Sequence, residues 1–350
     1  MAAGGRRRAA PAKSAGSAGS GARSGRGGAS GRAPATRARR GSANQKASRN
    51  GKSGTSASRT SGSASSSPAK ESPGGLAGLV AKRAGDWSLD SVDPGFVRAQ
   101  RHVWNLLQDH YFRMDTEGWH RLPDPPALIV GVHAAGIFPA DAWMFGLHWF
   151  RRFGQQRIMH GTAHEALMAT PVVGTYFRKM GVMSASRETV SAALEAGRDV
   201  IVYPGGDVDS MRPWRERDQV KLAGRRGFVK QAILSGVPIV PLATSGGMDT
   251  MFTLTEGRGL ARLLGLNKLA RTEALPLVLG LPWGIAPGML PFLPLPAKIR
   301  TELLDPIFLD DDPERAEDDE YVDAMYTEVE QRIQAGMDRL AARRSFPVFG

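Results

Sequence analysis

Short apolar runs alternate with amphipathic segments along the chain from about residue 76 onward. Three runs, 127–132 (ALIVGV), 200–203 (VIVY) and 238–243 (PIVPLA), contain no charged residue, which is typical of strands buried on both faces. Apolar residues at helical spacing, bounded by Pro and Gly, predict helices between and around these strands. The expected helices span residues 92–114, 140–150, 166–180 with a break at Pro171, 187–195, 226–234 and 314–343, and a further short strand spans 157–159.

Strands that alternate with helices predict an α/β fold, in which a mostly parallel mixed sheet is flanked by helices. We expect residues 76–350 to form this domain. In open α/β sheets, ligands bind outside the carboxyl ends of the strands. His133, Gly205 and residues 244–247 each follow an expected strand. The sequence therefore predicts that these three segments meet at one edge of the sheet.

The positive charge of the chain is concentrated at its beginning. Of the 46 Lys and Arg residues, 15 lie in residues 1–70, which contain no Asp or Glu, and the remainder has 31 basic against 34 acidic residues. Residues 1–75 lack the apolar side chains that would offset the entropy of ordering, so we expect a disordered basic tail. Basic arms bind anionic lipids or nucleic acid, and the absence of aromatic residues to stack on bases disfavours nucleic acid. A transit peptide and a solubilising tail are the alternatives.

Two features of composition narrow the chemistry and the location. The chain has no cysteine, which excludes disulfides, thiol catalysis and Cys-ligated metals. Residues 274–297 are uncharged and long enough to span a bilayer, but their six prolines argue against an uninterrupted helix. We expect either a loop that covers the core or a patch at a membrane interface that includes Trp283 and Phe292.

The stretch 132–141 (VHAAGIFPAD) places an imidazole after a strand and a carboxylate before a helix. Histidine can take a proton near neutral pH, and a carboxylate can orient the ring. We therefore predict that His133 is a general base whose second ring nitrogen is held by Asp141. The alternatives are a structural histidine and a first-turn helix acid. No GxSxG elbow is present, so no enzyme nucleophile is expected.

Two further segments are candidates for binding substrate. The turn YPGGD follows a strand, and its backbone N–H groups can face a phosphate or an oxyanion, with a plain tight turn as the alternative. Asp207 and Asp209 are too few acids for a metal site, so we expect solvated loop acids and no metal. Two arginines begin a helix, where guanidinium groups favour phosphates, with a solvated basic pair as the alternative. The candidate substrate-binding residues are Gly136, Tyr203, Pro204, Gly205, Gly206, Asp207, Arg225 and Arg226.

Four blocks in order make residues 95–305 resemble the PlsC-like glycerolipid acyltransferase superfamily, in particular its actinobacterial, diacylglycerol-acyltransferase-like branch. The usual family spacing has four residues between the catalytic His and Asp, whereas seven residues separate His133 from Asp141, with Gly136 in the spacer. The usual FPEG block reads YPGG here, and Gly in place of Glu resembles the neutral-lipid branch. The blocks are VGVHAAGIFPAD, YFRKMGVMSASRETV, VIVYPGGDVDSMRPW and GRRGFVKQAILSGVPIVPLATSGG.

The resemblance implies an O-acyltransferase that moves a fatty acyl group from acyl-CoA or acyl carrier protein to a glycerolipid hydroxyl, with no cofactor beyond this co-substrate. It implies a peripheral or monotopic protein at the cytoplasmic face of the cell membrane, with membrane lipids as acceptor and as surface. Contact with the membrane would run through residues 95–114, 274–297 and the basic tail. Two other classes stay open. One is a lipid hydrolase in which water replaces the alcohol at His133, and the other is a non-catalytic polyanion- or lipid-binding protein that acts through residues 1–70.

Overall fold

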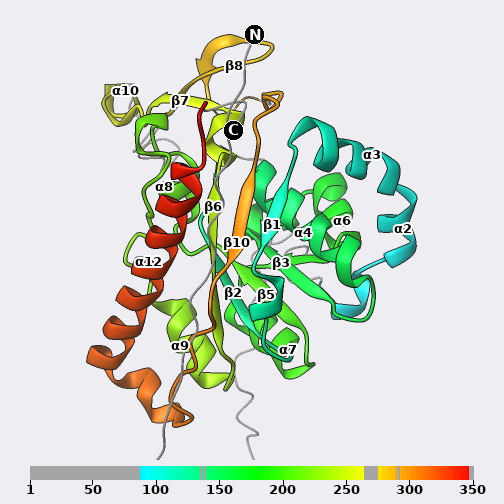
Figure 1. The fold of residues 1–350 in the computed structure, drawn as a ribbon, viewed down its shortest axis with the longest axis vertical. Helices are drawn as coiled ribbons and strands as arrows, with labels where there is room; N and C mark the ends of the chain where they lie inside the picture. The colour runs from blue at the N-terminus through cyan, green and yellow to red at the C-terminus, as the bar shows by residue number, and fades with distance from the viewer. Residues whose placement is uncertain are drawn as a thin grey trace, which may run out of the picture. The chain divides into compact units, whose positions relative to one another are not determined.

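The computed structural model describes residues 87–134, 136, 139–263, 275–288, 290 and 292–346. The predicted disordered tail at residues 1–75, and residues 76–86 of the predicted domain, lie outside the described residues. Figure 1 shows the described part of the chain as a coloured ribbon.

Seven strands form one sheet in the order β1-β10-β6-β2-β5-β3-β4 (Figure 1). The five strands from β6 to β4 are parallel, β10 pairs antiparallel with β6, and β1 pairs parallel with β10. The prediction of a mostly parallel mixed sheet is confirmed. The strands are β1 (Asp115–Glu117), β2 (Leu128–Gly131), β3 (Met159–Ala163), β4 (Val182–Ser184), β5 (Asp199–Val202), β6 (Ile239–Ser245) and β10 (Arg300–Leu303).

Helices cover both faces of the sheet. The longer ones are α4 (Ala140–Phe153), α6 (Pro171–Lys179), α7 (Arg187–Glu195), α9 (Gly227–Leu234) and α12 (Asp319–Ala342). The short helices are α2 (Pro94–Ala99), α3 (Arg101–Leu106), α5 (Glu165–Met168), α8 (Gly206–Ser210) and α10 (Arg258–Leu263). Single turns are η1 (Leu89–Ser91), η2 (Leu107–Tyr111), η3 (Trp119–Arg121), η4 (Trp214–Glu216), η5 (Gly247–Thr250) and η6 (Pro313–Glu317).

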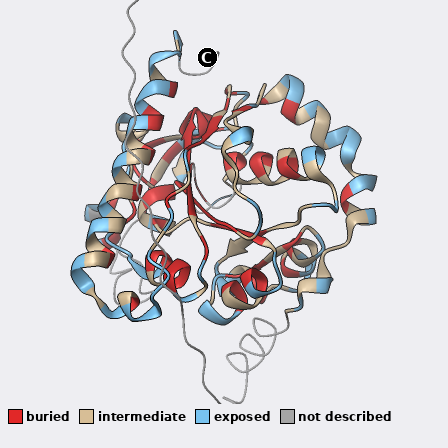
Figure 2. Ribbon diagram, turned by 60° about the horizontal axis from the view of Figure 1, so that its bottom comes forward, coloured by how far each residue is buried: buried red, intermediate tan, exposed pale blue. Residues whose placement is uncertain are grey.

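Strand β2 lies inside the sheet because its sequence is apolar on both faces. Alternate residues of a strand face opposite sides. Leu128 and Val130 join a core cluster with residues of α7, α9 and α12, whereas Ile129 packs with Trp149 of α4. Figure 2 shows buried residues concentrated on the strands and on parts of the helices.

The helix predicted for residues 92–114 is divided in the structure into α2, α3 and the π-helical turn η2. Gln100 separates α2 from α3 and serves as C-cap of the first and N-cap of the second. The other predicted helices agree better with the structure, because their boundaries carry strong local signals, whereas the short strand predicted at 157–159 shares only residue 159 with β3. Helix α7 begins after Ser186, whose side chain accepts the Thr189 N–H, and α6 begins at Pro171.

A second, three-stranded antiparallel sheet was not predicted. It is formed by β7 (Phe252–Thr255), β8 (Leu277–Gly280) and β9 (Gly284–Pro287) in that order. The last two strands lie in the uncharged segment 274–297. This segment was expected to be either a loop that covers the core or a patch at a membrane interface. In the parts of the chain that the structure describes, no helix combines the length and apolarity needed to cross a bilayer.

A buried ion pair fastens β5 to the segment before β3. The Asp199 side chain is fully buried and accepts from the Arg157 guanidinium at 2.6 Å (Nε to Oδ2) and 2.8 Å (Nη2 to Oδ1). Its Oδ1 also accepts the Ala127 backbone N–H at 3.0 Å, at the start of β2. One carboxylate therefore joins three segments of the chain.

We expect Asp199→Ala to lower the free energy of unfolding by about 3 kcal/mol, because it leaves the Arg157 guanidinium, whose side chain is only 13% exposed, without its counter-charge. The matched control is Asp109→Ala, which removes the half-exposed ion pair with Arg151 and should cost no more than about 1 kcal/mol. Urea denaturation of both variants measures the difference, and equal losses would contradict a special role for the buried pair.

Candidate active site

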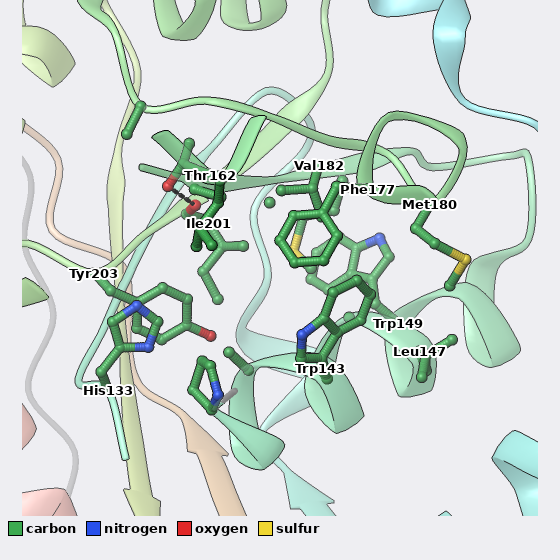
Figure 3. Close-up of a pocket in the computed structure, with 18 of the residues that line it drawn as sticks. His133, Trp143, Leu147, Trp149, Thr162, Phe177, Met180, Val182, Ile201 and Tyr203 are labelled. Carbon is green, nitrogen blue, oxygen red and sulfur yellow. Dashed lines mark hydrogen bonds between the residues drawn. The ribbon is translucent and has the colours of Figure 1, made fainter. Parts of the chain in front are cut away.

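The carboxyl ends of β2, β5 and β6 meet at one edge of the sheet, as predicted. The imidazole of His133, after β2, stacks on the ring of Tyr203, after β5, with centroids 4.0 Å apart and an interplanar angle of 11° (Figure 3). Gly247, after β6, lies against Asp141, since a Cβ at residue 247 would be 3.1 Å from the Cβ and Cγ of the aspartate. A side chain at residue 247 would therefore push the carboxylate out of place.

His133 and Tyr203 line one side of a cavity of about 710 Å³ (Figure 3). Most of the remaining wall is apolar and comes from α4, α6 and the strands β3 and β4. A cavity of this size, with few polar groups, suits a small-molecule or lipid ligand. These helices were predicted from the sequence, whereas the space between them was not. The large apolar residues of the wall include Trp143, Leu147, Phe150, Phe177 and Met180.

The environment keeps the His133 imidazole neutral. Burial lowers the pKa of His133 to about 3, and the nearby positive charge of Arg212 lowers it further. The Nδ1 atom of the ring is buried, and no described residue forms a hydrogen bond with it. Buried polar atoms almost always have partners, so this nitrogen is a candidate functional atom.

Asp141 lies in the first turn of α4 and is almost completely buried. No side chain in the described part of the chain donates a hydrogen bond to either carboxylate oxygen. Burial raises the pKa of Asp141 to about 7, and the negative charge of Asp209 also raises it. A carboxylate kept in this state is destabilising, and such groups cluster at functional sites.

The predicted hydrogen bond between His133 and Asp141 is not present in the structure. The imidazole lies flat on Tyr203, whereas the carboxylate lies beside Gly247. Both groups are buried and unpaired. The pairing prediction is therefore wrong for this structure, and the catalytic roles of the two residues stay predictions.

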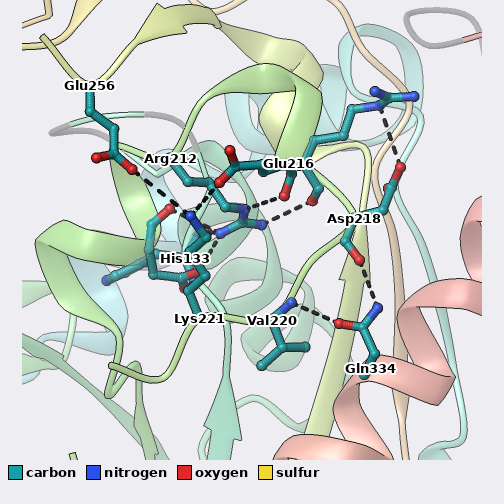
Figure 4. A network of polar contacts seen from close by, with 10 residues as sticks. His133, Arg212, Glu216, Asp218, Val220, Lys221, Glu256 and Gln334 are labelled. Carbon is teal, nitrogen blue, oxygen red and sulfur yellow. Dashed lines mark hydrogen bonds and ion pairs between the residues drawn. The ribbon is translucent and has the colours of Figure 1, made fainter. Parts of the chain in front are cut away.

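Asp209 was expected to be a solvated loop acid, and this prediction is wrong. The side chain is fully buried, where its carboxylate accepts the backbone N–H of His133 and pairs with Arg212. Nη1 of Arg212 donates to the His133 carbonyl oxygen at 2.8 Å, so the pair holds both backbone groups of His133 (Figure 4). Arg212 also donates to the carbonyl oxygens of Glu216 at 3.2 Å and Arg217 at 3.0 Å. We call this arrangement the Asp209–Arg212 clamp.

The sequence contained a local signal for the clamp, namely an Asp and an Arg three residues apart at the end of a predicted turn. It gave no sign that both side chains are buried. Burial raises the pKa of Asp209 to about 7, against the opposing effect of Arg212. Two carboxyl groups with raised pKa values, Asp141 and Asp209, therefore lie near the neutral His133.

The YPGGD turn places its residues at different depths. Gly206 and Asp207 line the cavity together with Tyr203 and with Gly136 of the loop after β2. Gly205 is buried below the turn, where a Cβ would overlap the carbonyl oxygen of Lys221. Only glycine fits there, so the close approach between this turn and the segment at residue 221 depends on it.

The two arginines of the predicted phosphate site are separated in the structure. Arg225 lines the cavity, pairs with Asp207 at 2.9 Å (Nη2 to Oδ1) and donates to the Pro204 carbonyl oxygen at 3.1 Å. Arg226 does not line the cavity, and its Nε pairs with the Asp323 carboxylate of α12 at 2.5 Å. Pro204 and Arg225 therefore lie together at the turn, whereas the Arg226 side chain pairs with α12.

Three known proteins are similar to this chain in sequence or in structure. An uncharacterised protein of Mycobacterium leprae is 30% identical over 280 residues, which cover 79% of this chain and 74% of that protein. Diacylglycerol O-acyltransferase 2 of Homo sapiens is 27% identical over 157 residues, which cover 41% of this chain and 38% of the human protein. The solved structure of the 1-acyl-sn-glycerophosphate acyltransferase PlsC of Thermotoga maritima aligns with a TM-score of 0.40 at 17% identity, and the alignment covers 77% of this chain and 90% of that chain.

The family model described as diacylglycerol acyltransferase matches residues 94–334. The match includes the His133 loop, the YPGGD turn, the clamp and the whole seven-stranded sheet. The chain therefore belongs to the diacylglycerol acyltransferase family, and it is an acyltransferase that acts on glycerolipids.

Proposed function

We propose that this protein transfers a fatty acyl group from an acyl thioester, acyl-CoA or acyl carrier protein, to the hydroxyl group of a neutral acylglycerol, with His133 as general base. The observation that supports this most is the apolar cavity of about 710 Å³ that has the unpaired imidazole in its wall. The apolar part of the cavity holds the acyl chain. The imidazole then lies where the thioester carbonyl and the acceptor hydroxyl meet.

The reaction needs only a base and correct positioning of the two substrates. The acceptor hydroxyl gives its proton to His133 while its oxygen bonds to the thioester carbonyl carbon. The C–S bond then breaks, and the departing sulfur takes the proton from the imidazolium. No acyl group is attached to the enzyme, in keeping with the lack of cysteine and of a GxSxG elbow.

Asp141 has the role of stabilising the imidazolium. The low pKa of His133 means that its cation is unfavourable in this buried site. A second group must therefore offset the charge as it forms, and the unpaired carboxylate of Asp141 is buried close to the same loop. Its charge would act on the imidazolium through the low-dielectric interior, without a direct hydrogen bond to the ring.

The charges around the cavity favour a neutral acceptor over a phosphorylated one. Among the residues that the structure describes, two guanidinium groups line the cavity, those of Arg157 and Arg225. Each is paired with a carboxylate, Asp199 and Asp207 respectively. A phosphomonoester would have to compete with these ion pairs, whereas the free hydroxyl of a mono- or diacylglycerol would not.

We expect purified protein with labelled acyl-CoA to esterify mono- or diacylglycerol faster than lysophosphatidate or other lysolipids. His133→Ala should reduce the rate by at least about 100-fold, the usual contribution of a general base. The matched control is His120→Ala, which removes an exposed imidazole outside the cavity and should keep the rate. Release of free fatty acid without any acceptor would instead identify a hydrolase, and unchanged turnover in the His133 variant would remove the base assignment.

We expect Asp141→Asn to lose acyl transfer and to gain stability at alkaline pH. The pKa of Asp141 is about 7 in the folded chain against an ordinary value of 3.8, so wild-type protein loses stability as pH rises through that window, where only the unfolded chain releases the proton. The variant should therefore gain on the order of 2 kcal/mol relative to wild type between pH 5 and pH 8. Urea denaturation of both proteins at pH 5 and pH 8 tests this, and an equal pH dependence of stability in the two proteins would contradict a buried acid with a raised pKa at residue 141.

The wild-type rate should rise as pH increases through about 7, since Asp141 must be ionised to stabilise the imidazolium. His133 adds no inflection in this range, because its pKa is about 3. A rate that stays flat from pH 6 to pH 8.5 would contradict the assigned role of Asp141.

Asp209→Asn tests the Asp209–Arg212 clamp. We expect a loss of about 3 kcal/mol in the free energy of unfolding, and a lower kcat at a temperature where circular dichroism shows a folded protein. The KM for the acyl thioester should change little, because Asp209 does not line the cavity. Asp218→Asn, in the same loop and half-buried beside Arg217, is the control. Equal effects of the two variants on kcat would show that the clamp does not position His133.

A further inference from the structure

The three-stranded sheet has two faces of different character, and its register decides which residues share a face. Val278 of β8 is opposite Ala286 of β9, and Leu279 is opposite Ile285. Val278 is fully buried, whereas Leu279 is 43% exposed and Ile285 is 65% exposed. One face of the sheet therefore packs on the protein, and the other faces outward.

The outward face is apolar on β8 and β9, and on β7 it carries the exposed Thr255 opposite Leu277. Leu279 and Ile285 continue into the turn between the strands, where Leu281 is 57% exposed and Trp283 is 52% exposed. Leu281 bridges to Leu293, which is 61% exposed. The segment 274–297 that carries these residues has no charged side chain. We define the outward apolar face as Leu279, Leu281, Trp283, Ile285 and Leu293.

The inward face packs on the loop that follows His133. Val278 forms a cluster with Ala134, Met248 and Met251, and Phe292 packs against it. Gly136 is so close to Met251 that a Cβ at residue 136 would lie 2.5 Å from the methionine Cε. The sheet follows β6 directly through η5 and lies at the carboxyl end of β6 (Figure 1). The outward apolar face is thus joined through one layer of side chains to the candidate active site.

We propose that the outward apolar face is a docking surface for a lipid bilayer and that it brings the membrane to the edge of the sheet that carries His133. This proposal deepens the proposed function and rests on it for the source of the substrate, because neutral acylglycerols reside in membranes and not in water. Exposed apolar patches on a protein surface mark interaction sites. The 24 residues 274–297 include no charged side chain, and Trp283 lies in the turn between β8 and β9. Uncharged segments that carry tryptophan suit the membrane interface.

The backbone limits how deeply this surface enters the membrane. β7 and β9 are both edge strands of the small sheet, so part of their N–H and C=O groups has no partner within it. Unpaired backbone groups are costly in hydrocarbon, and a spanning or deeply buried open sheet is therefore unfavourable. Docking at the level of the headgroups and the first acyl carbons satisfies both the apolar side chains and the strand edges.

The test measures partition of the full chain into phosphatidylcholine vesicles, by co-sedimentation without acyl donor. Zwitterionic vesicles remove the electrostatic attraction of the 15 basic residues of the tail. We expect the double variant Leu281→Glu/Ile285→Glu to partition at least about 10-fold less than wild type, since two apolar side chains lose their contact with lipid. The matched control is Leu234→Glu, at an exposed leucine that ends α9, which should partition like wild type.

A second measurement does not depend on the double variant. Brominated phosphatidylcholine should quench a component of the tryptophan fluorescence that is missing in Trp283→Phe. Equal partition of wild type and the double variant overturns the proposal, as does a wild type that does not bind vesicles. Unchanged partition together with a shift from dimer to monomer in sedimentation would show that a second copy covers this face instead. Because no acyl donor is used, a failure here is separate from a failure of acyl transfer.

Discussion

The candidate active site depends on one buried ion pair. The carboxylate of Asp209 and the guanidinium of Arg212 hold the backbone N–H and the carbonyl of His133, and Arg212 also binds the turn at residues 216–217. Two buried charges are costly to bring out of water, and only a full set of hydrogen bonds compensates for this. The chain meets that condition by using backbone groups as partners. The backbone of His133 is therefore held by the ion pair and its ring lies on Tyr203, while Nδ1 of the ring has no hydrogen-bond partner among the described residues.

The regular part of the fold was predictable because burial leaves a periodic trace in the sequence. β2, β5 and β6 are apolar runs, and α7 and α9 begin and end at recognisable caps or glycines. β1, β4 and β10 are only three or four residues long and contain polar residues, among them Thr116, Thr301 and Glu302, whose partners come from distant segments, so they leave no such trace. The small sheet β7–β9 was missed because its prolines and glycines resemble a loop.

The candidate site was predictable in its residue types and not in its contacts. The His133 loop and the YPGGD turn meet as expected, because parallel strands end at the same edge. The role of Asp209 was missed, since burial of an acid depends on distant segments and a loop sequence does not show it. Arg226 was assigned to the substrate by its neighbour Arg225, but helix α12 supplies the carboxylate that takes its charge.

The pairing of β1 with β10 has a consequence for how the polypeptide acquires its shape during synthesis. Thr116 and Thr301 share a hydrogen bond of 2.8 Å between their hydroxyl groups although 185 residues separate them. Residues 115–117 leave the ribosome long before their partner strand exists, and contacts of such sequence separation form late. Until then, the nascent chain has an open sheet edge at β6, the strand that bears Gly247 at its end. The seven-stranded sheet that carries the site is therefore completed only after residues 300–303 have been translated.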